Sequence, residues 1–185
     1  ILYALIFVPL GIVGASNGFN MIAGYNGLES GLGIIILTFL SYVAWLNDFG
    51  WVAVMGLCMV AALLAFYIFN KHPAKIFPGD TLTYSVGALI AIIAITANIE
   101  KVALIIFIPY IIELILKLRG KFQKESFATL NKDNSLSVKE IYGLEHIVVY
   151  IHNKLNKKVY ERDVVLHLYL LQFLFIILAS LTLIS

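Results

Sequence analysis

The chain has 185 residues, of which 61% are hydrophobic and 13% charged, and its mean hydropathy is +0.94. Soluble domains carry about 45–50% apolar and about 25% charged residues, so this composition excludes an ordinary soluble domain and predicts an integral membrane protein. The net charge of +2 says little by itself, because the placement of charges decides how a chain is oriented in a membrane.

Six apolar runs follow one another and predict an all-α, polytopic membrane helix bundle. The runs are continuous rather than alternating, which favours helices over a β-barrel. A full span needs about 20 residues, so the short first run, 2–14, predicts a helix that is cut. Because the chain also begins at Ile1, we expect residues 1–185 to be the C-terminal part of one membrane domain. The complete spans are expected at 32–46, 51–69, 82–99, 102–116 and 164–184.

Three polar segments, 15–31, 70–81 and 119–163, alternate with tight turns at 47–50 and 100–101. If each run crosses the membrane once, the three segments share one face and the turns share the other. Of the 13 Lys and Arg residues, only Lys101 lies on the second face, while Lys117 borders the first. The positive-inside rule therefore predicts that the three polar segments are cytoplasmic.

The first polar segment carries a dense group of amides, glycines and one acid. Asn20, Asn26 and Glu29 lie close together in the sequence, and Gly24 and Gly27 permit backbone conformations that are closed to other residues. Helix capping and turn chemistry account for any one of these residues equally well. The group as a whole indicates a binding site at the membrane boundary.

Asp80 is the single carboxylate of the second polar segment. The segment holds a Pro-Gly pair that stops either neighbouring helix from running through, and Lys71 and Lys75 precede the acid. This combination is suited to hold a metal ion and a phosphate. The alternative is a short basic loop in which Asp80 caps the next helix.

The third polar segment predicts a small loop region. Residues 131–135 are expected to form a turn between two short extended pieces, in a short hairpin. Residues 138–155 predict an amphipathic helix, because apolar residues recur at three- and four-residue spacing. His146 and His152 on this helix are poorly spaced for a shared metal, and we interpret both as surface histidines.

Taken together, the motifs resemble the polyprenyl-phosphate N-acetylhexosamine-1-phosphate transferases of the glycosyltransferase 4 family. They are Asn-x-x-Asn-x-x-Ala-Gly-x-Asn-Gly-Leu-Glu over 17–29, Phe-Pro-Gly-Asp-Thr over 77–81 and Tyr-Glu-Arg-Asp over 160–163. The residues of these motifs resemble those of the archaeal and eukaryotic branch, which starts N-glycan assembly on dolichyl phosphate, rather than those of the bacterial peptidoglycan branch.

The resemblance implies transfer of an N-acetylhexosamine-1-phosphate, with GlcNAc-1-phosphate expected first, from a UDP-sugar to polyprenyl or dolichyl phosphate with release of UMP. It implies that Asn20 and Asp80 hold a catalytic Mg²⁺, which Mn²⁺ could replace, and that Gly24 and Asn26, with Glu29, bind the nucleotide. One acid and one amide suffice, because Mg²⁺ keeps several waters and takes substrate phosphates as ligands. The third polar segment departs from the family's motifs. Its basic residues Arg119, Lys121 and Lys124, with Lys75 of the second segment, are the candidates for diphosphate and sugar binding, and a cationic anchor beside the membrane explains the basic residues of the third segment equally well.

The expected partners are the UDP-N-acetylhexosamine, the polyprenyl phosphate and the lipid bilayer, with a homodimer left open and no nucleic acid. The active face is expected at the cytoplasm, on the plasma membrane of a prokaryote or the endoplasmic reticulum of a eukaryote. Family members carry an adjacent Asp-Asp pair upstream, and this chain has none. Activity is therefore expected to require an N-terminal half that lies outside these residues.

Two other interpretations compete with the enzyme. A transporter or permease would place amides and carbonyls of interrupted helices around an ion at mid-bilayer depth. Here the polar groups gather on one face instead, and the sequence shows no internal repeat. A non-catalytic membrane subunit is favoured only by the lack of the upstream half. Metal-dependent binding of a uridine nucleotide would distinguish the enzyme from both.

Overall fold

The computed structural model describes residues 1–122 and 127–183. Within these residues the fold is all-α apart from one two-stranded hairpin, as predicted. The elements in chain order are η1 (Tyr3–Phe7), α1 (Val8–Met21), α2 (Leu28–Leu46), α3 (Gly50–Asn70), α4 (Gly79–Thr96), α5 (Glu100–Ile106), α6 (Ile108–Arg119), β1 (Thr129–Leu130), β2 (Leu136–Ser137), α7 (Leu144–Lys154) and α8 (Glu161–Leu181).

Five helices of the described chain are long and apolar enough to cross a membrane, with η1 and α1 counted as one. They confirm that the chain is an integral membrane protein with several spans. The second of them, α2, is the central helix, because 67% of its span is buried against 22% for α3 and 28% for α8. The spans are Tyr3–Met21, Leu28–Leu46, Gly50–Asn70, Gly79–Thr96 and Glu161–Leu181.

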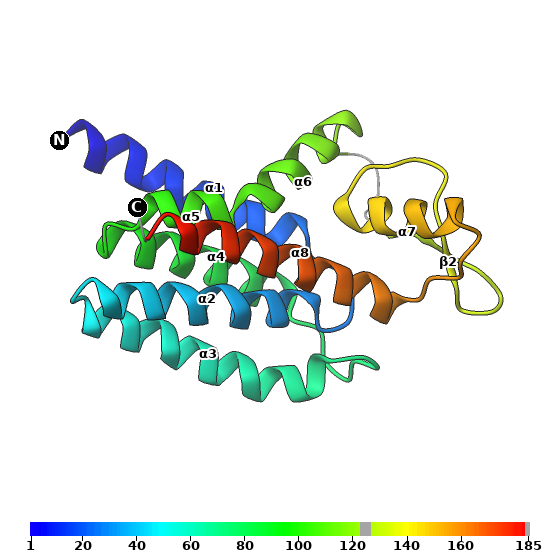
Figure 1. The fold of residues 1–185 in the computed structure, drawn as a ribbon, viewed down its shortest axis with the longest axis horizontal. Helices are drawn as coiled ribbons and strands as arrows, with labels where there is room; N and C mark the ends of the chain where they lie inside the picture. The colour runs from blue at the N-terminus through cyan, green and yellow to red at the C-terminus, as the bar shows by residue number, and fades with distance from the viewer. Residues whose placement is uncertain (123–126, 184–185) are drawn as a thin grey trace.

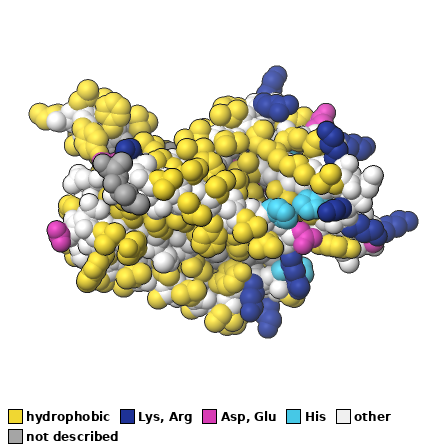
Figure 2. Space-filling view, viewed as in Figure 1, with side chains coloured by type: hydrophobic (Ala, Val, Ile, Leu, Met, Phe, Trp, Pro, Cys, Tyr) yellow, Lys and Arg dark blue, Asp and Glu magenta, His cyan; other side chains and the backbone are white. Residues whose placement is uncertain are grey.

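All three polar segments lie at one end of the bundle (Figure 1). The loops 22–27 and 71–78, the hairpin and α7 gather there, while the N-terminus and the turns before α3 and α5 lie at the opposite end. Figure 2 shows most Lys and Arg side chains at the same loop end, beside a largely hydrophobic surface. We call this end the loop end.

The structure shortens the first polar segment. Helix α1 runs on through Asn20 to Met21 and α2 begins at Leu28, so the predicted loop 15–31 is a loop only at 22–27. The polar residues stay helical because they bond locally: Asn17 Nδ2 donates to the carbonyl of Val13 at 2.8 Å. Within this loop the backbone turns at Gly24 and Gly27, which both have positive φ, a conformation that favours glycine.

The predicted span 102–116 is two helices, α5 and α6, separated at Phe107. Pro109 lacks an N–H and its ring obstructs the preceding turn, so the helix cannot continue straight. Figure 1 shows α6 leaving the bundle at an angle. The buried Gln172 on α8 donates to the carbonyl of Ile106 at 3.2 Å, next to the break. A buried polar side chain of α8 therefore bonds to a backbone carbonyl at the break between α5 and α6.

The third polar segment contains both predicted pieces. Thr129 pairs with Ser137 and Leu130 with Leu136 in an antiparallel hairpin, which confirms the predicted turn at 131–135. Helix α7 is the expected amphipathic helix, although it begins only at Leu144.

Helix α7 is fixed to α6 by a buried carboxylate. Glu113 is fully buried; its Oε2 accepts the backbone N–H of Leu144 at 2.7 Å, and its Oε1 lies 3.5 Å from Lys117 Nζ. A carboxylate at a helix N-terminus satisfies a free N–H and complements the helix dipole. This docking buries the first turn of α7. The interpretation of His146 as a surface residue is therefore wrong, since it is only 3% exposed.

Candidate functional site

A hollow of about 230 Å³ lies at the loop end, between the last turn of α1, the loop 22–27, the start of α2 and the start of α4. We call it the acid hollow. Four of the residues named from the sequence line it: Asn20, Gly24, Glu29 and Asp80. Among the residues that the structure describes, none that lines it is Lys or Arg. The remaining lining residues are Ala23, Phe77, Pro78, Gly79, Thr83 and Phe127.

Asn20 and Asp80 are brought together by the packing of α1 against α4. Helix α4 begins at Gly79, so Asp80 stands exposed in its first turn. One turn later the buried Thr83 donates through Oγ1 to Asn20 Oδ1 at 2.6 Å. The amide oxygen keeps a second lone pair for another partner. The sequence therefore places a carboxylate and an amide oxygen at one hollow, although they are far apart along the chain.

Glu29 adds a second carboxylate to the acid hollow. It is 3% exposed, and its Oε1 accepts the N–H of Gly24 at 2.6 Å. Its Oε2 is buried and has no hydrogen-bond partner among the described residues. A buried carboxylate oxygen without a partner is costly unless a ligand or a water completes it. The donor set of Asn20, Asp80 and Glu29 consists of oxygens alone, which suits a hard cation.

Gly24 is closely covered by the third polar segment. A Cβ added at Gly24 would lie 2.8 Å from the ring of Phe127, and its φ of +147° is itself unfavourable for a side chain. The N–H of Ala128 donates to the Tyr25 hydroxyl at 3.2 Å and holds this contact in place. Burial raises the pKa of Tyr25 to about 12, so the hydroxyl stays protonated at neutral pH.

Asn26 points away from the acid hollow and toward α8. Glu161 accepts the backbone N–H of Asn26 at 2.6 Å and its side-chain amide at 3.1 Å. Tyr169, two turns further along α8, donates to the carbonyl of Gly27 at 2.6 Å. The loop 22–27 is therefore clamped by two residues of the last helix. The predicted role of Asn26 at the nucleotide stays a prediction.

The loop that leads to Asp80 is clamped in a similar way. Asn70, the last residue of α3, is fully buried. It accepts from Ser30 Oγ at 2.6 Å and donates to the carbonyl of Ile76 at 3.0 Å. Asn70 thus ties the loop 71–78 to the start of α2, and this contact helps to set the position of Asp80.

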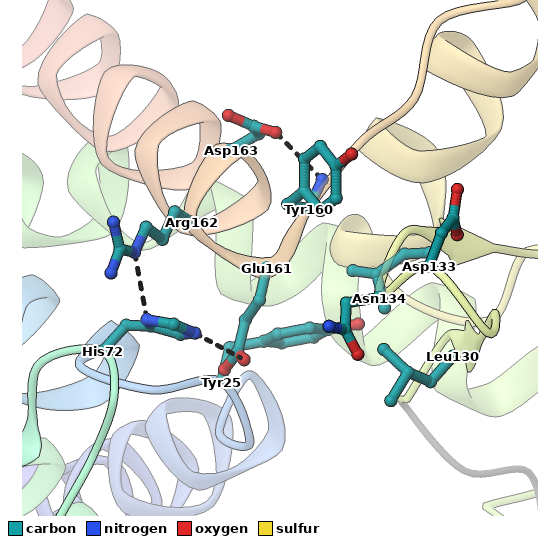
Figure 3. Close-up of a pocket in the computed structure, with 10 residues that line it drawn as sticks. Tyr25, His72, Leu130, Asp133, Asn134, Tyr160, Glu161, Arg162 and Asp163 are labelled. Atoms are coloured by element: carbon teal, nitrogen blue, oxygen red, sulfur yellow. Dashed lines mark hydrogen bonds and ion pairs between the residues drawn. The ribbon is translucent and has the colours of Figure 1, made fainter.

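A polar network joins the second polar segment to the motif at 160–163 (Figure 3). Arg162 Nε donates to His72 Nδ1 at 3.0 Å, and His72 Nε2 lies 3.9 Å from Glu161 Oε2. His72 therefore lies between the cation and the carboxylate. These residues line a larger hollow of about 690 Å³, together with Tyr25, Tyr160 and residues of the hairpin.

Among the described residues, the three predicted diphosphate-binding candidates do not line the acid hollow. Lys75 is exposed on the loop 71–78, and Lys121 is exposed just after α6. Arg119 lines a separate hollow with Lys139 and Tyr150. The fourth candidate, Lys124, lies outside the described residues. The roles of all four stay predictions.

Sequence reasoning missed the residues that hold the site together. Thr83 follows Asp80 at helical spacing, and this spacing was the available signal. His72 and Asn70 lie within the second polar segment but were not assigned to the site. The contact of Glu161 with Asn26 spans 135 positions, and no local pattern in the sequence indicates it.

The spans and the hollow of carboxylate and amide oxygens define a polytopic membrane protein with a polar site at one end of its helix bundle. The model of the family described as Glycosyl transferase family 4 matches residues 1–98, which is more than half of the chain. The chain therefore belongs to glycosyl transferase family 4. This membership confirms the resemblance drawn from the motifs.

Individual relatives agree with the family. The chain is 42% identical over 153 residues to a protein of Saccharolobus solfataricus that is named a UDP-N-acetylglucosamine–dolichyl-phosphate N-acetylglucosaminephosphotransferase; the match covers 80% of the chain and 47% of that protein. A Sulfolobus acidocaldarius protein of the same name is 33% identical over 183 residues, with 97% and 54% covered. A phospho-N-acetylmuramoyl-pentapeptide-transferase of Halalkalibacterium halodurans is 41% identical over 110 residues, with 58% and 34% covered.

Both longer matches are to archaeal proteins, which confirms the predicted similarity to the archaeal branch. The chain spans about half the length of these two relatives. Activity is therefore to be measured on the longest natural polypeptide that contains this chain, which we call the parent polypeptide.

Replacing Thr83 by valine in the parent polypeptide is expected to lower the rate of any reaction that depends on the position of Asn20 about fivefold. Valine keeps the shape of threonine but removes the hydroxyl that orients Asn20, and one such hydrogen bond contributes roughly 1 kcal/mol. Initial rates at saturating substrate measure the effect. Thr83→Ser keeps the hydroxyl and should stay close to the unaltered rate; equal rates in all three proteins would show that this bond does not position Asn20.

Proposed function

We propose that this chain forms part of a membrane enzyme that transfers N-acetylglucosamine-1-phosphate from UDP-N-acetylglucosamine to a polyprenyl phosphate such as dolichyl phosphate, with release of UMP. The names of the archaeal relatives support the two substrates, and the family membership supports the reaction class. The observation that carries the proposal is the convergence of Asn20, Glu29 and Asp80 on one acid hollow at the loop end of the bundle.

The acid hollow fits a Mg²⁺ ion. It offers amide and carboxylate oxygens, it includes the partnerless Oε2 of Glu29, and its described lining has no cation to compete with a metal. Asn20 and Asp80 would hold the ion, and Glu29 lines the same hollow. When bound, Mg²⁺ would neutralise charge on the diphosphate. Mn²⁺ takes similar oxygen ligands and is proposed as a substitute.

The residues of the chain have distinct tasks in this reaction. An oxygen of the lipid phosphate forms a bond to the β-phosphorus of the UDP-sugar, and the bond from that phosphorus to the bridging oxygen breaks, so that UMP leaves with the electron pair. Such a reaction depends mainly on positioning and electrostatics. Thr83 orients Asn20, Asn70 ties down the loop before Asp80, and Glu161 fixes the loop that carries Gly24.

We further propose that the loop end faces the cytoplasm, where nucleotide sugars are available. The gathering of Lys and Arg at that end supports this orientation through the positive-inside rule (Figure 2). In this orientation the acid hollow would lie at the membrane boundary, within reach of the phosphate of a lipid whose tail lies in the bilayer.

The test is transfer of radiolabelled sugar phosphate from UDP-N-acetylglucosamine to polyprenyl phosphate by the parent polypeptide, with and without Mg²⁺. A lipid-linked product that requires the metal is expected. A well-folded parent polypeptide that transfers nothing from UDP-N-acetylglucosamine or UDP-N-acetylgalactosamine would contradict the proposal.

A further inference from the structure

A second hollow of the loop end has the opposite character to the acid hollow. It measures about 290 Å³ and lies between the end of α3 and the start of α8. Lys71, His72 and Arg162 line it, with Tyr67 beside them and Val165 and Leu166 as an apolar wall. In the described part of the chain, no Asp or Glu lines this hollow. We call it the cationic hollow.

The other hollows described above lack this combination. Arg162 and His72 also border the hollow of about 690 Å³, but Asp133, Glu161 and Asp163 line that one. The hollow that contains Arg119 and Lys139 also contains Glu140. The described lining of the cationic hollow therefore contains no carboxylate, although Glu161 Oε2 lies 3.9 Å from His72 Nε2, and the excess of basic side chains in the lining favours an anion.

The side chain of Arg162 and the backbone of Lys71 are held in place at this hollow. Arg162 uses Nε to donate to His72 Nδ1, and its terminal amino groups make no hydrogen bond with the described residues. Those two groups form a planar fork that matches phosphate oxygens. The backbone N–H of Lys71 donates to the carbonyl of Tyr67 at 2.9 Å, and Gly27 packs so closely here that an added Cβ would lie 3.3 Å from Lys71 Cα.

The position of the cationic hollow indicates what kind of anionic ligand it binds. Both helices that form it are membrane spans, and the hollow lies where α3 ends and α8 begins. Below it the two helices present exposed apolar side chains, including Ile68 at 63% and Leu166 at 54% exposure. Figure 2 shows the same arrangement on a larger scale, with the Lys and Arg side chains of the loop end next to a largely hydrophobic surface. A ligand with a charged head and apolar tails fits both features.

We propose that the cationic hollow binds the phosphate of an anionic membrane lipid, with the headgroup on Lys71 and Arg162 and the acyl chains along α3 and α8. The site is separate from the acid hollow and does not depend on the proposed reaction. Because His72 and Arg162 contact each other and Glu161 clamps the loop 22–27, a lipid bound here stabilises the arrangement of the loop end.

The experiment measures lipid binding to the delipidated parent polypeptide in detergent by native mass spectrometry. The probes are phosphatidylglycerol, phosphatidylcholine and inorganic phosphate. Phosphatidylglycerol is expected to bind most tightly and to raise the thermal unfolding midpoint. Lys71→Gln with Arg162→Gln should weaken its binding about 30-fold, since each basic residue near an anionic lipid surface contributes about fivefold.

Two further variants keep the test decisive. Lys154→Gln with Lys157→Gln removes the same charge from exposed positions near the end of α7 that do not line the cationic hollow, and it should leave binding nearly unchanged. Lys71→Arg keeps the charge and the fork of Arg162, and it should retain most of the affinity. If the Gln pair fails to fold, the single change Lys71→Gln should still weaken binding about fivefold.

Three results would overturn the proposal. If the unaltered protein and the double variant Lys71→Gln with Arg162→Gln bind phosphatidylglycerol with equal affinity, the cationic hollow is not the lipid site. An equal loss of affinity in the double variant Lys154→Gln with Lys157→Gln would show that binding depends on general surface charge and not on the cationic hollow. Inorganic phosphate that stabilises the protein as well as phosphatidylglycerol does, with the same dependence on Lys71 and Arg162, would exclude a lipid as the ligand.

Discussion

Asp80→Asn is expected to reduce sugar-phosphate transfer by the parent polypeptide at least about 100-fold. Asparagine has nearly the shape of aspartate, so the first turn of α4 keeps its structure, while the negative charge of the acid hollow falls by one. Loss of a metal ligand or of a single preorganised electrostatic contact costs about 10² or more in rate. The measurement is the initial rate over a range of Mg²⁺ concentrations, and the half-saturating concentration should rise.

Asp48→Asn is the matched control for this experiment. Asp48 is exposed in the turn before α3, at the opposite end of the bundle, and has a φ of +64°, which asparagine also tolerates. The same chemical change should leave the rate there close to that of the unaltered protein. Undiminished transfer by Asp80→Asn would leave the family assignment unchanged but would show that Asp80 is not a metal ligand.

Gly87→Ala is expected to destabilise the bundle by about 1–3 kcal/mol, because α1 and α4 cross most closely at this residue. A Cβ added at Gly87 would lie 2.5 Å from the carbonyl oxygen of Ala15 and 2.7 Å from Ser16 Cα. Both atoms belong to the backbone, so a rotamer change cannot relieve the contact and the helices must separate. Close crossings of membrane helices commonly rely on small residues. The thermal unfolding midpoint in detergent should fall by several degrees.

Gly11→Ala separates this packing effect from helix propensity. Gly11 also lies within a helix, but the nearest atom to its added Cβ, Ile95 Cδ1, is 3.7 Å away, which is an ordinary contact. Alanine is the better helix former by about 0.5–1 kcal/mol, so this variant should unfold at the same temperature or slightly higher. A midpoint for Gly87→Ala equal to that of Gly11→Ala would show that the α1–α4 crossing tolerates a methyl group.

Much of the fold follows from the sequence, because lipid leaves few options for the backbone. Continuous apolar runs predict helices, and their alternation with polar segments predicts that those segments meet at one end. Two bounds differ for local reasons. The polar residues before Met21 stay helical through bonds to their own helix, and Pro109 divides a run whose composition is otherwise continuous.

The sequence predicts the residues that line the acid hollow better than the contacts that hold them in position. Asn20, Gly24, Glu29 and Asp80 stand out as polar or glycine residues beside apolar runs, and the structure brings them to one hollow. Their positions depend on contacts between distant segments, such as Glu161 with Asn26. Contacts of this kind follow from how whole helices pack, and no periodicity in a single sequence records them.

The clamp from α8 has a consequence for biosynthesis. The loop 22–27 is translated well before Glu161 and Tyr169, the two residues of α8 that hold it. A nascent chain that has not reached α8 can insert its earlier spans yet leaves this loop without either contact. A nonsense or frameshift mutation shortly before Tyr160 would therefore release a membrane-embedded product with an unheld site, even though every residue of the acid hollow has been made.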